Sequence, residues 1–281
     1  MNHTSTVPVT VETLRVPDAT LHYEVRGAGP LVVLVGAPMD ARSFEPLADL
    51  LAADHTVLTT DPRGINRSTV DDRDRDSTPE LRADDLARLI THLDAGPAAV
   101  LGSSGGAVSV LALAQAHPGL VHTAIAHEPP LHHGLDDNEE LRERTEDLIA
   151  THLSGDVVGA WRKFLAIANI EMPEEVFQLM FAGDRTKQEA ADDDFQYAHM
   201  IRSTVRWVPD IAHLRSTATR VLIGIGEDSS GQLCDRSSRA LSAALGIEPT
   251  MFPGGHIGFA EDPDAFSVRL RTVLSEGGPG R

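Results

Sequence analysis

One stretch decides the fold: Pro97-Ala-Ala-Val-Leu-Gly-Ser-Ser-Gly-Gly-Ala-Val-Ser-Val-Leu-Ala-Leu-Ala-Gln-Ala-His117. Residues 98–101 are a short apolar run typical of a buried strand, and the small residues after Gly106 indicate a helix. Between them stands the motif G-x-S-x-G, in the strand-to-helix context that it requires. A strand that reverses at once into a helix strains the central residue, so its neighbours can carry almost no side chain. We predict that Ser104 is a nucleophile; a Ser/Gly-rich turn without chemistry is the alternative.

Composition sets limits on the class of protein. With 281 residues, of which 41% are hydrophobic and 23% charged, the chain suits one large α/β domain with an insertion. A net charge of −18 argues against nucleic acid or an anionic membrane as a partner, because both would repel the protein. The one cysteine, Cys234, allows no internal disulfide. Residues 1–8 show no signal peptide, and no apolar run is long enough to span a membrane, so we expect a cytoplasmic protein.

Strands and helices alternate through most of the chain. Strands are predicted at 11–16, 20–26, 31–35, 55–60, 98–101, 121–127, 220–226 and 249–252, and helices at 43–51, 79–93, 235–245 and 263–274. This alternation predicts a mostly parallel, doubly wound sheet.

The alternation stops at Pro129. Residues 131–212 show helical periods only, with helices expected at 138–153, 157–170, 173–181 and 188–204. We therefore expect a core made of residues 1–130 and 213–281, and an all-helical insertion over 131–212 that acts as a lid.

A serine hydroxyl needs a base to remove its proton and an acid to orient that base. Of 13 histidines, His256 is the best placed, because it follows the last predicted strand in Pro253-Gly-Gly-His-Ile-Gly-Phe259. The glycines beside it leave room for a substrate next to the imidazole. A surface-loop histidine without a role is the alternative.

This order of Ser104, a helical cap and a late histidine resembles the α/β-hydrolase fold superfamily. It is most similar to the capped branch of haloperoxidase-like esterases, epoxide hydrolases and haloalkane dehalogenases. The loop Asp61-x-Arg63-Gly64-x-x-x-Ser68 resembles that branch's D-x-R-G-x-G-x-S motif, with Asn66 in place of the second glycine. A serine stands where dehalogenases and epoxide hydrolases carry aspartate, which implies acyl chemistry.

The resemblance also implies an oxyanion hole made of two backbone N–H groups. One belongs to Gly105, the residue after the nucleophile. The other belongs to Ala37 in Val35-Gly-Ala-Pro38, where the family commonly has His-Gly-x-Pro. Met39, Ser103 and Phe259, which neighbour these residues and His256 in the sequence, are expected to contact the substrate.

The triad acid stays open between several carboxylates. Asp228 follows the strand ending at Gly226, the region where most of the superfamily places its acid, although the usual position there is Ser229. Glu128 ends the strand after the nucleophile helix, as the acid does in some dehalogenases, and two prolines follow it. Glu128 is the first choice, Asp228 the second and Glu227 the third.

No metal or cofactor is expected. His127, His132 and His133 stand near Glu128, a combination that suits zinc, but we expect them to line a pocket or face solvent. The expected partner is a small-molecule substrate, and the sequence leaves a homo-oligomer open.

The sequence therefore predicts a serine hydrolase that cleaves an ester or lactone of a small, largely apolar substrate through an acyl-enzyme. Two alternatives remain. One is other chemistry on the same fold, such as C–C bond hydrolysis, peptide release, perhydrolysis, or a cofactor-free lyase or cyclase step in secondary metabolism. The other is a non-catalytic, ligand-binding relative.

Overall fold

The computed structural model describes residues 7–276. Residues 1–6, on which most of the expectation about a signal peptide rests, lie outside this range. Within it, no helix is both long enough and apolar enough to cross a membrane.

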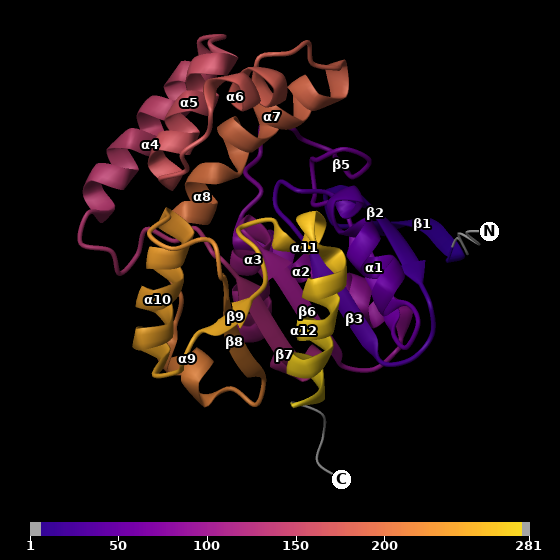
Figure 1. Ribbon diagram of the computed structural model, residues 1–281. Coiled ribbons are helices and arrows are strands. Elements are labelled where there is room, and N and C mark those ends of the chain that lie inside the picture. The colour runs from indigo at the N-terminus through magenta and orange to yellow at the C-terminus, as the bar shows by residue number, and fades with distance from the viewer. Residues whose placement is uncertain (1–6, 277–281) are drawn as a thin grey trace, which may run out of the picture.

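The centre of the molecule is a single sheet whose strands run in the order β1-β2-β4-β3-β6-β7-β8-β9 (Figure 1). The pairs from β4 to β9 are parallel, and β2 is antiparallel to β1, β4 and β5. The strands are β1 (Val9–Val16), β2 (Ala19–Arg26), β3 (Leu31–Val35), β4 (Thr56–Thr60), β5 (Thr69–Val70), β6 (Ala98–Ser103), β7 (Val121–His127), β8 (Arg220–Gly226) and β9 (Thr250–Phe252). The doubly wound, mostly parallel sheet predicted from the sequence is confirmed.

Helices cover both faces of the sheet because its central strands are apolar on both sides. Along β3, for example, Val33 and Val35 pack into one hydrophobic core and Val32 and Leu34 into the other. The first core lies under α2 (Pro79–Leu93), α3 (Gly105–Ala116), α9 (Ile211–Ser216) and α10 (Leu233–Leu245). The second lies under α1 (Glu45–Leu51), α11 (Gly258–Glu261) and α12 (Pro263–Ser275), with a short 3-10 turn at Ala41–Phe44.

Between β7 and β8 the chain leaves the sheet and forms a group of helices at one end of it (Figure 1). These are α4 (Asn138–Leu153), α5 (Val157–Ala168), α6 (Glu174–Phe181), α7 (Lys187–His199) and α8 (Ile201–Val205). The expected single helix over 188–204 is wrong, because the backbone at Met200 (φ −121°, ψ −50°) separates α7 from α8. Met200 is buried and packs with Ala37, Ile65 and Phe195, so the break brings the chain down onto the loops of the sheet. The short elements β5, α9 and α11 were not predicted, because so few residues show no period.

The loop from Asp61 to Ser68 connects the sheet to these helices. Asp61 is fully buried and accepts hydrogen bonds from the backbone N–H groups of Ala41 (3.0 Å) and Arg67 (3.1 Å). Asn66 N–H donates to Asp192 of α7 (2.9 Å). Gly64, at φ +82°, faces the ring of Phe195 on the same helix. The loop therefore holds α7 against the core.

We predict that Gly64→Ala destabilises the fold more than Gly96→Ala. The two glycines share nearly the same backbone angle (φ +82° and +83°), so the conformational cost of a side chain, about 1–2 kcal/mol, is common to both. At Gly64 the added Cβ would lie 2.2 Å from Phe195 Cε1, whereas at Gly96 nothing lies within 4 Å. Overpacking should therefore add about 1–3 kcal/mol for Gly64→Ala alone. Urea denaturation measures this difference, and equal losses for both variants would contradict the contact.

Candidate active site

Ser104 stands on the sharp turn between β6 and α3. Its backbone angles, φ 56° and ψ −125°, lie outside the regions that L-residues ordinarily occupy. The turn is closed by two glycines: a Cβ on Gly102 would lie 2.3 Å from the carbonyl oxygen of Gly106, and one on Gly106 would lie 2.5 Å from that of Val35. The strain therefore has a steric cause, and it leaves the Ser104 hydroxyl at the N-terminus of α3, the positive end of the helix dipole.

Glu128 and His256 form a hydrogen-bonded pair. Glu128 follows β7, is fully buried, and has a left-handed backbone (φ 53°). Its Oε1 accepts a hydrogen bond from Gly226 N–H at the end of β8 (2.8 Å), and its Oε2 accepts one from His256 Nδ1 (2.6 Å). Because the carboxylate holds the proton on Nδ1, the neutral imidazole has Nε2 free to accept a proton.

Each member of the pair shifts the pKa of the other in the direction that favours its charged form. Burial works to raise the pKa of Glu128, but the hydrogen bond and the charge of His256 outweigh it and hold that pKa well below its usual range. Burial likewise works to lower the pKa of His256, but Cys234 and Glu128 beside it raise that pKa above its usual value. The arrangement therefore favours an imidazolium next to a carboxylate, which is the charge state that a histidine base reaches when it takes up a proton.

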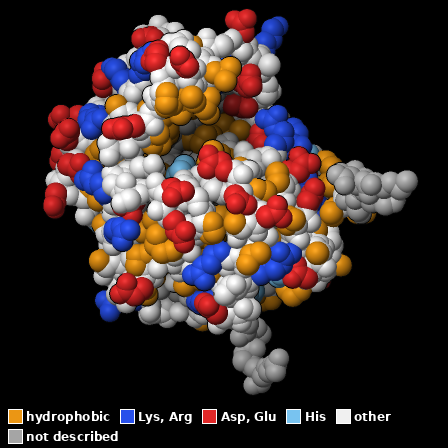
Figure 2. Space-filling model, in the orientation of Figure 1, with side chains coloured by type: hydrophobic (Ala, Val, Ile, Leu, Met, Phe, Trp, Pro, Cys, Tyr) orange, Lys and Arg blue, Asp and Glu red, His pale blue; other side chains and the backbone are white. Residues whose placement is uncertain are grey.

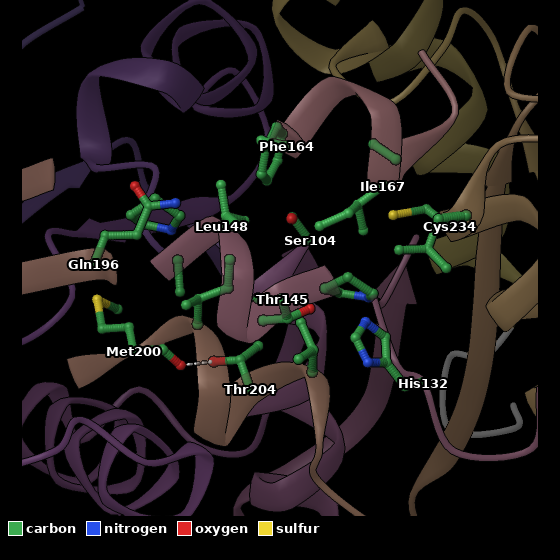
Figure 3. A pocket seen from close by; sticks show the side chains of 18 of the residues that line it. Ser104, His132, Thr145, Leu148, Phe164, Ile167, Gln196, Met200, Thr204 and Cys234 are labelled. Carbon is green, nitrogen blue, oxygen red and sulfur yellow. Dashed lines mark hydrogen bonds between the residues drawn. The ribbon is translucent and has the colours of Figure 1, made fainter. Parts of the chain in front are cut away.

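Ser104 and His256 line one cavity, whose volume is about 110 Å³. Figure 2 shows the hollow between the upper helices and the body of the molecule, with hydrophobic side chains inside it and along its upper rim. In Figure 3 the Ser104 hydroxyl stands in the middle of the space, between Gln196 and His132. Within residues 7–276 no hydrogen bond joins Ser104 to His256. Such bonds often form only when substrate is bound. The cavity is lined by Ala37, Pro38, Ser104, Gly105, Pro130, His132, Thr145, Leu148, Phe164, Ile167, Ala168, Ile170, Gln196, Met200, Ile201, Thr204, Val205, Gln232, Leu233, Cys234 and His256.

Two backbone amides lie beside Ser104. Gly105 opens α3, and Ala37 follows β3, which pairs with β6 up to Val35 and Gly102. The two residues are in close contact, because a Cβ on Gly105 would lie 2.4 Å from the carbonyl oxygen of Ala37. Neither N–H donates to another group of the described chain. Both amides are therefore free to meet a negative oxygen near Ser104.

The structure places the other carboxylates apart from His256. Asp228 and Glu227 are both exposed at the end of β8, and neither makes a hydrogen bond to the imidazole. The backbone explains this: Glu227 N–H donates to Phe252 and Asp228 N–H to Gly254, which aligns the segment with β9 while the side chains face solvent. Of the three acids considered, the geometry brings Glu128 alone to His256.

Three residues expected to contact substrate do not line the cavity. Ser103, the last residue of β6, is fully buried with its hydroxyl 3.1 Å from His127 Nδ1. Phe259 is stacked on Phe44, with ring centroids 4.5 Å apart, inside the second core. Met39 packs against that same core. Their places near Ser104 and His256 in the sequence did not reveal on which side of the sheet their side chains fall.

Of two further cavity residues, Cys234 has no signal in the sequence that marks it as part of a site, whereas His132 was expected to line a pocket or face solvent and lines the cavity. Cys234 stands in the first turn of α10, beside His256, and His132 comes from the loop after β7. One ligand atom each from Glu128, Cys234 and His256 lie within 4.8 Å of one another, a set that could hold a metal ion. An ion there would compete for the Glu128–His256 pair. His127 and His133 do not join this set, since His127 is enclosed by Phe252, Phe259 and Phe266 and His133 is exposed.

The fold and the elbow define a hydrolase class. Residues 31–269 match the model of the alpha/beta hydrolase family, and the chain belongs to that family. The expected superfamily is thereby confirmed.

Particular relatives agree with this class. An uncharacterized hydrolase of Bacillus subtilis, YraK, is 33% identical over 271 residues, which are 94% of this chain and 96% of the relative. A zearalenone hydrolase of Cladophialophora bantiana is 32% identical over 113 residues, 39% of this chain and 43% of its own. Among solved structures, an esterase from Exiguobacterium antarcticum superposes with a TM-score of 0.69 at 20% identity, over 92% of this chain and 96% of that one. The chain is a hydrolase of this family.

We predict that His256 titrates above the ordinary histidine pKa of 6.5, and that Glu128→Gln lowers its pKa by about 1–3 units. The sign follows from charge, because the carboxylate stabilises the imidazolium and the amide does not. An NMR pH titration of the His256 ring carbons measures the midpoint. Asp228→Asn, a matched carboxylate-to-amide change at the exposed neighbour, should leave it nearly unchanged. A larger drop in Asp228→Asn than in Glu128→Gln would refute the pairing.

Proposed function

We propose that this protein is a serine hydrolase that cleaves an ester or lactone of a small, largely apolar substrate through an acyl-enzyme. The observation that carries the proposal is that Ser104, on its strained elbow, and the buried Glu128–His256 pair meet in one cavity. A hydroxyl, a free imidazole nitrogen and an orienting carboxylate are the parts that nucleophilic acyl transfer needs. The N–H groups of Ala37 and Gly105 are positioned to act as the oxyanion hole.

In the first half of the reaction, His256 Nε2 takes the proton of Ser104 as Oγ attacks the carbonyl carbon. The new Oγ–C bond pushes charge onto the carbonyl oxygen, where Ala37 and Gly105 N–H stabilise it. Glu128 stabilises the imidazolium that forms. When the C–O bond of the ester breaks, His256 gives its proton to the leaving alcohol.

The second half repeats these steps with water as the nucleophile. His256 takes a proton from water, the hydroxide oxygen bonds to the acyl carbon, and the Ser104 ester bond breaks with the proton returned to Oγ. The products are a carboxylic acid and free enzyme. Every proton in this cycle passes through His256 Nε2, so the proposed cycle uses only groups of this chain, the substrate and water.

We also propose that residues 131–212 act as a cap on a core made of residues 1–130 and 213–281. Helices α4, α5, α7 and α8 supply Thr145, Leu148, Phe164, Ile167, Gln196, Ile201 and Thr204 to the cavity wall. Most of these side chains are apolar. A substrate held there is surrounded by hydrocarbon, which favours small apolar acyl or alkyl groups.

We predict that wild-type protein hydrolyses p-nitrophenyl esters in the series from acetate to octanoate, and that Ser104→Ala abolishes this. Glu128→Gln should lower turnover by about 10⁴-fold, as loss of the acid does in other triads. Asp228→Asn, its matched control, should stay near wild type. Absorbance of released p-nitrophenolate measures all four proteins. Equal rates for wild type and Ser104→Ala would exclude serine catalysis.

A pH profile tests the role of His256 separately. The base must be neutral to accept the Ser104 proton, so kcat/KM should rise with pH as the imidazolium loses its proton. Because Cys234 and Glu128 raise the pKa of His256, the midpoint should lie above 6.5. Cys234→Ala removes one of these neighbours and should move the midpoint to lower pH. A profile that is flat across this range would speak against His256 as the base.

A further inference from the structure

The cavity contains a buried imidazole that the reaction above does not use. His132 lines the cavity wall and its side chain is almost completely buried, with 1% exposed. Neither Nδ1 nor Nε2 has a hydrogen-bond partner. Its backbone is held firmly, because His132 N–H donates to the carbonyl oxygen of Val205 at the end of α8 (2.9 Å). A buried polar ring without partners costs stability, so its place in a cavity wall points to a ligand that would pair with it.

The ring is uncharged at neutral pH. Burial is the largest influence on it, and the positive charges of Arg206 and Arg142 add to that effect against Asp137, so that the pKa of His132 falls to about 4. A neutral imidazole presents one N–H donor and one acceptor nitrogen. Both nitrogens are buried from water, in the wall of a cavity that is lined mostly by hydrocarbon.

The hydroxyl groups of the neighbouring wall residues already donate hydrogen bonds within the protein. Thr145 Oγ1 donates to Leu141 within α4 (2.8 Å), and Thr204 Oγ1 donates to Met200 (2.8 Å; dashed in Figure 3). Figure 3 places His132 on one side of Ser104 and Gln196 on the other. On the side of Ser104 where His132 lies, its imidazole is therefore the group that can both donate a hydrogen bond to a ligand and accept one from it.

We propose that His132 is a specificity-determining residue that binds a hydroxyl group carried by the substrate. A hydroxyl offers one donor and two acceptor positions, so it can satisfy a neutral imidazole at whichever nitrogen it reaches. A carboxylate can only accept, and a hydrocarbon leaves both nitrogens unpaired. This inference rests on the proposed function, since it names the class of ester that the Ser104 site prefers: a small hydroxylated one.

Binding to a variant that cannot turn over tests the inference apart from catalysis. Ser104→Ala is titrated calorimetrically with methyl phenylacetate and its 3- and 4-hydroxy derivatives, and with phenyl acetate and its 3- and 4-hydroxy derivatives. These probes place a hydroxyl on the acyl side and on the leaving-group side. At least one hydroxylated ester should bind about tenfold more tightly than its parent. The preference should disappear in Ser104→Ala/His132→Phe and persist in Ser104→Ala/His133→Phe, which changes the exposed neighbour.

Two further readouts separate a substrate contact from a structural role. His132→Phe removes an unpartnered polar ring and keeps an aromatic one, so its melting temperature should equal or exceed that of wild type, and His132→Gln should restore part of the hydroxyl preference. If all hydroxylated esters bind like their parents in Ser104→Ala, or if the preference survives His132→Phe, the inference is overturned. Failure of the proposed function would give a different result: wild type would hydrolyse none of these esters, whether or not it binds them.

Discussion

The structure depends on one constraint, the strained turn at Ser104. Strand β6 reverses into α3 without a loop, and this is feasible only because Gly102 and Gly106 approach backbone oxygens more closely than any Cβ could. Such strain persists only where the surroundings over-determine it, and here β3 and β7 flank β6 on either side. Two neighbouring strands thus hold in place the residue whose backbone is strained.

The same sheet determines which carboxylate reaches His256. Glu128 leaves β7 with a left-handed backbone, and β8, the next strand, offers Gly226 N–H to its carboxylate. The acid is therefore held from two adjacent strands while the imidazole comes from the loop after β9. Asp228, one strand further along, turns to solvent because its own backbone is bonded to Gly254. The position of this carboxylate follows from strand order, because Glu128 follows β7, the strand beside the one that ends at Ser104.

Local patterns predicted the order of elements, the elbow and the histidine loop, because each depends on residues close together in the sequence. The choice between Glu128 and Asp228 stayed open, because it depends on which neighbouring strand turns its side chain inward. Ser103 and Phe259 were expected to contact the substrate because they stand near Ser104 and His256 in the sequence. Neither lines the cavity, because proximity in the sequence does not say to which face a side chain points. Cys234 lines the cavity only after α10 packs against the loop that follows β7, and no local pattern encodes that packing. His132 was expected to line a pocket or to face solvent, and the packing of α8 against its loop decides between the two.

His132 and Ser104 illustrate two ways in which a fold gives up stability at a site. At Ser104 the cost is in the backbone, and the compensation is a hydroxyl that points into the cavity. At His132 the cost is in solvation, because a neutral ring is removed from water with neither nitrogen paired. An apolar wall around it makes any hydrogen bond to a ligand stronger, since no water competes for it. The unpartnered ring in this apolar wall is therefore the basis of the proposed discrimination between hydroxylated and unsubstituted ligands.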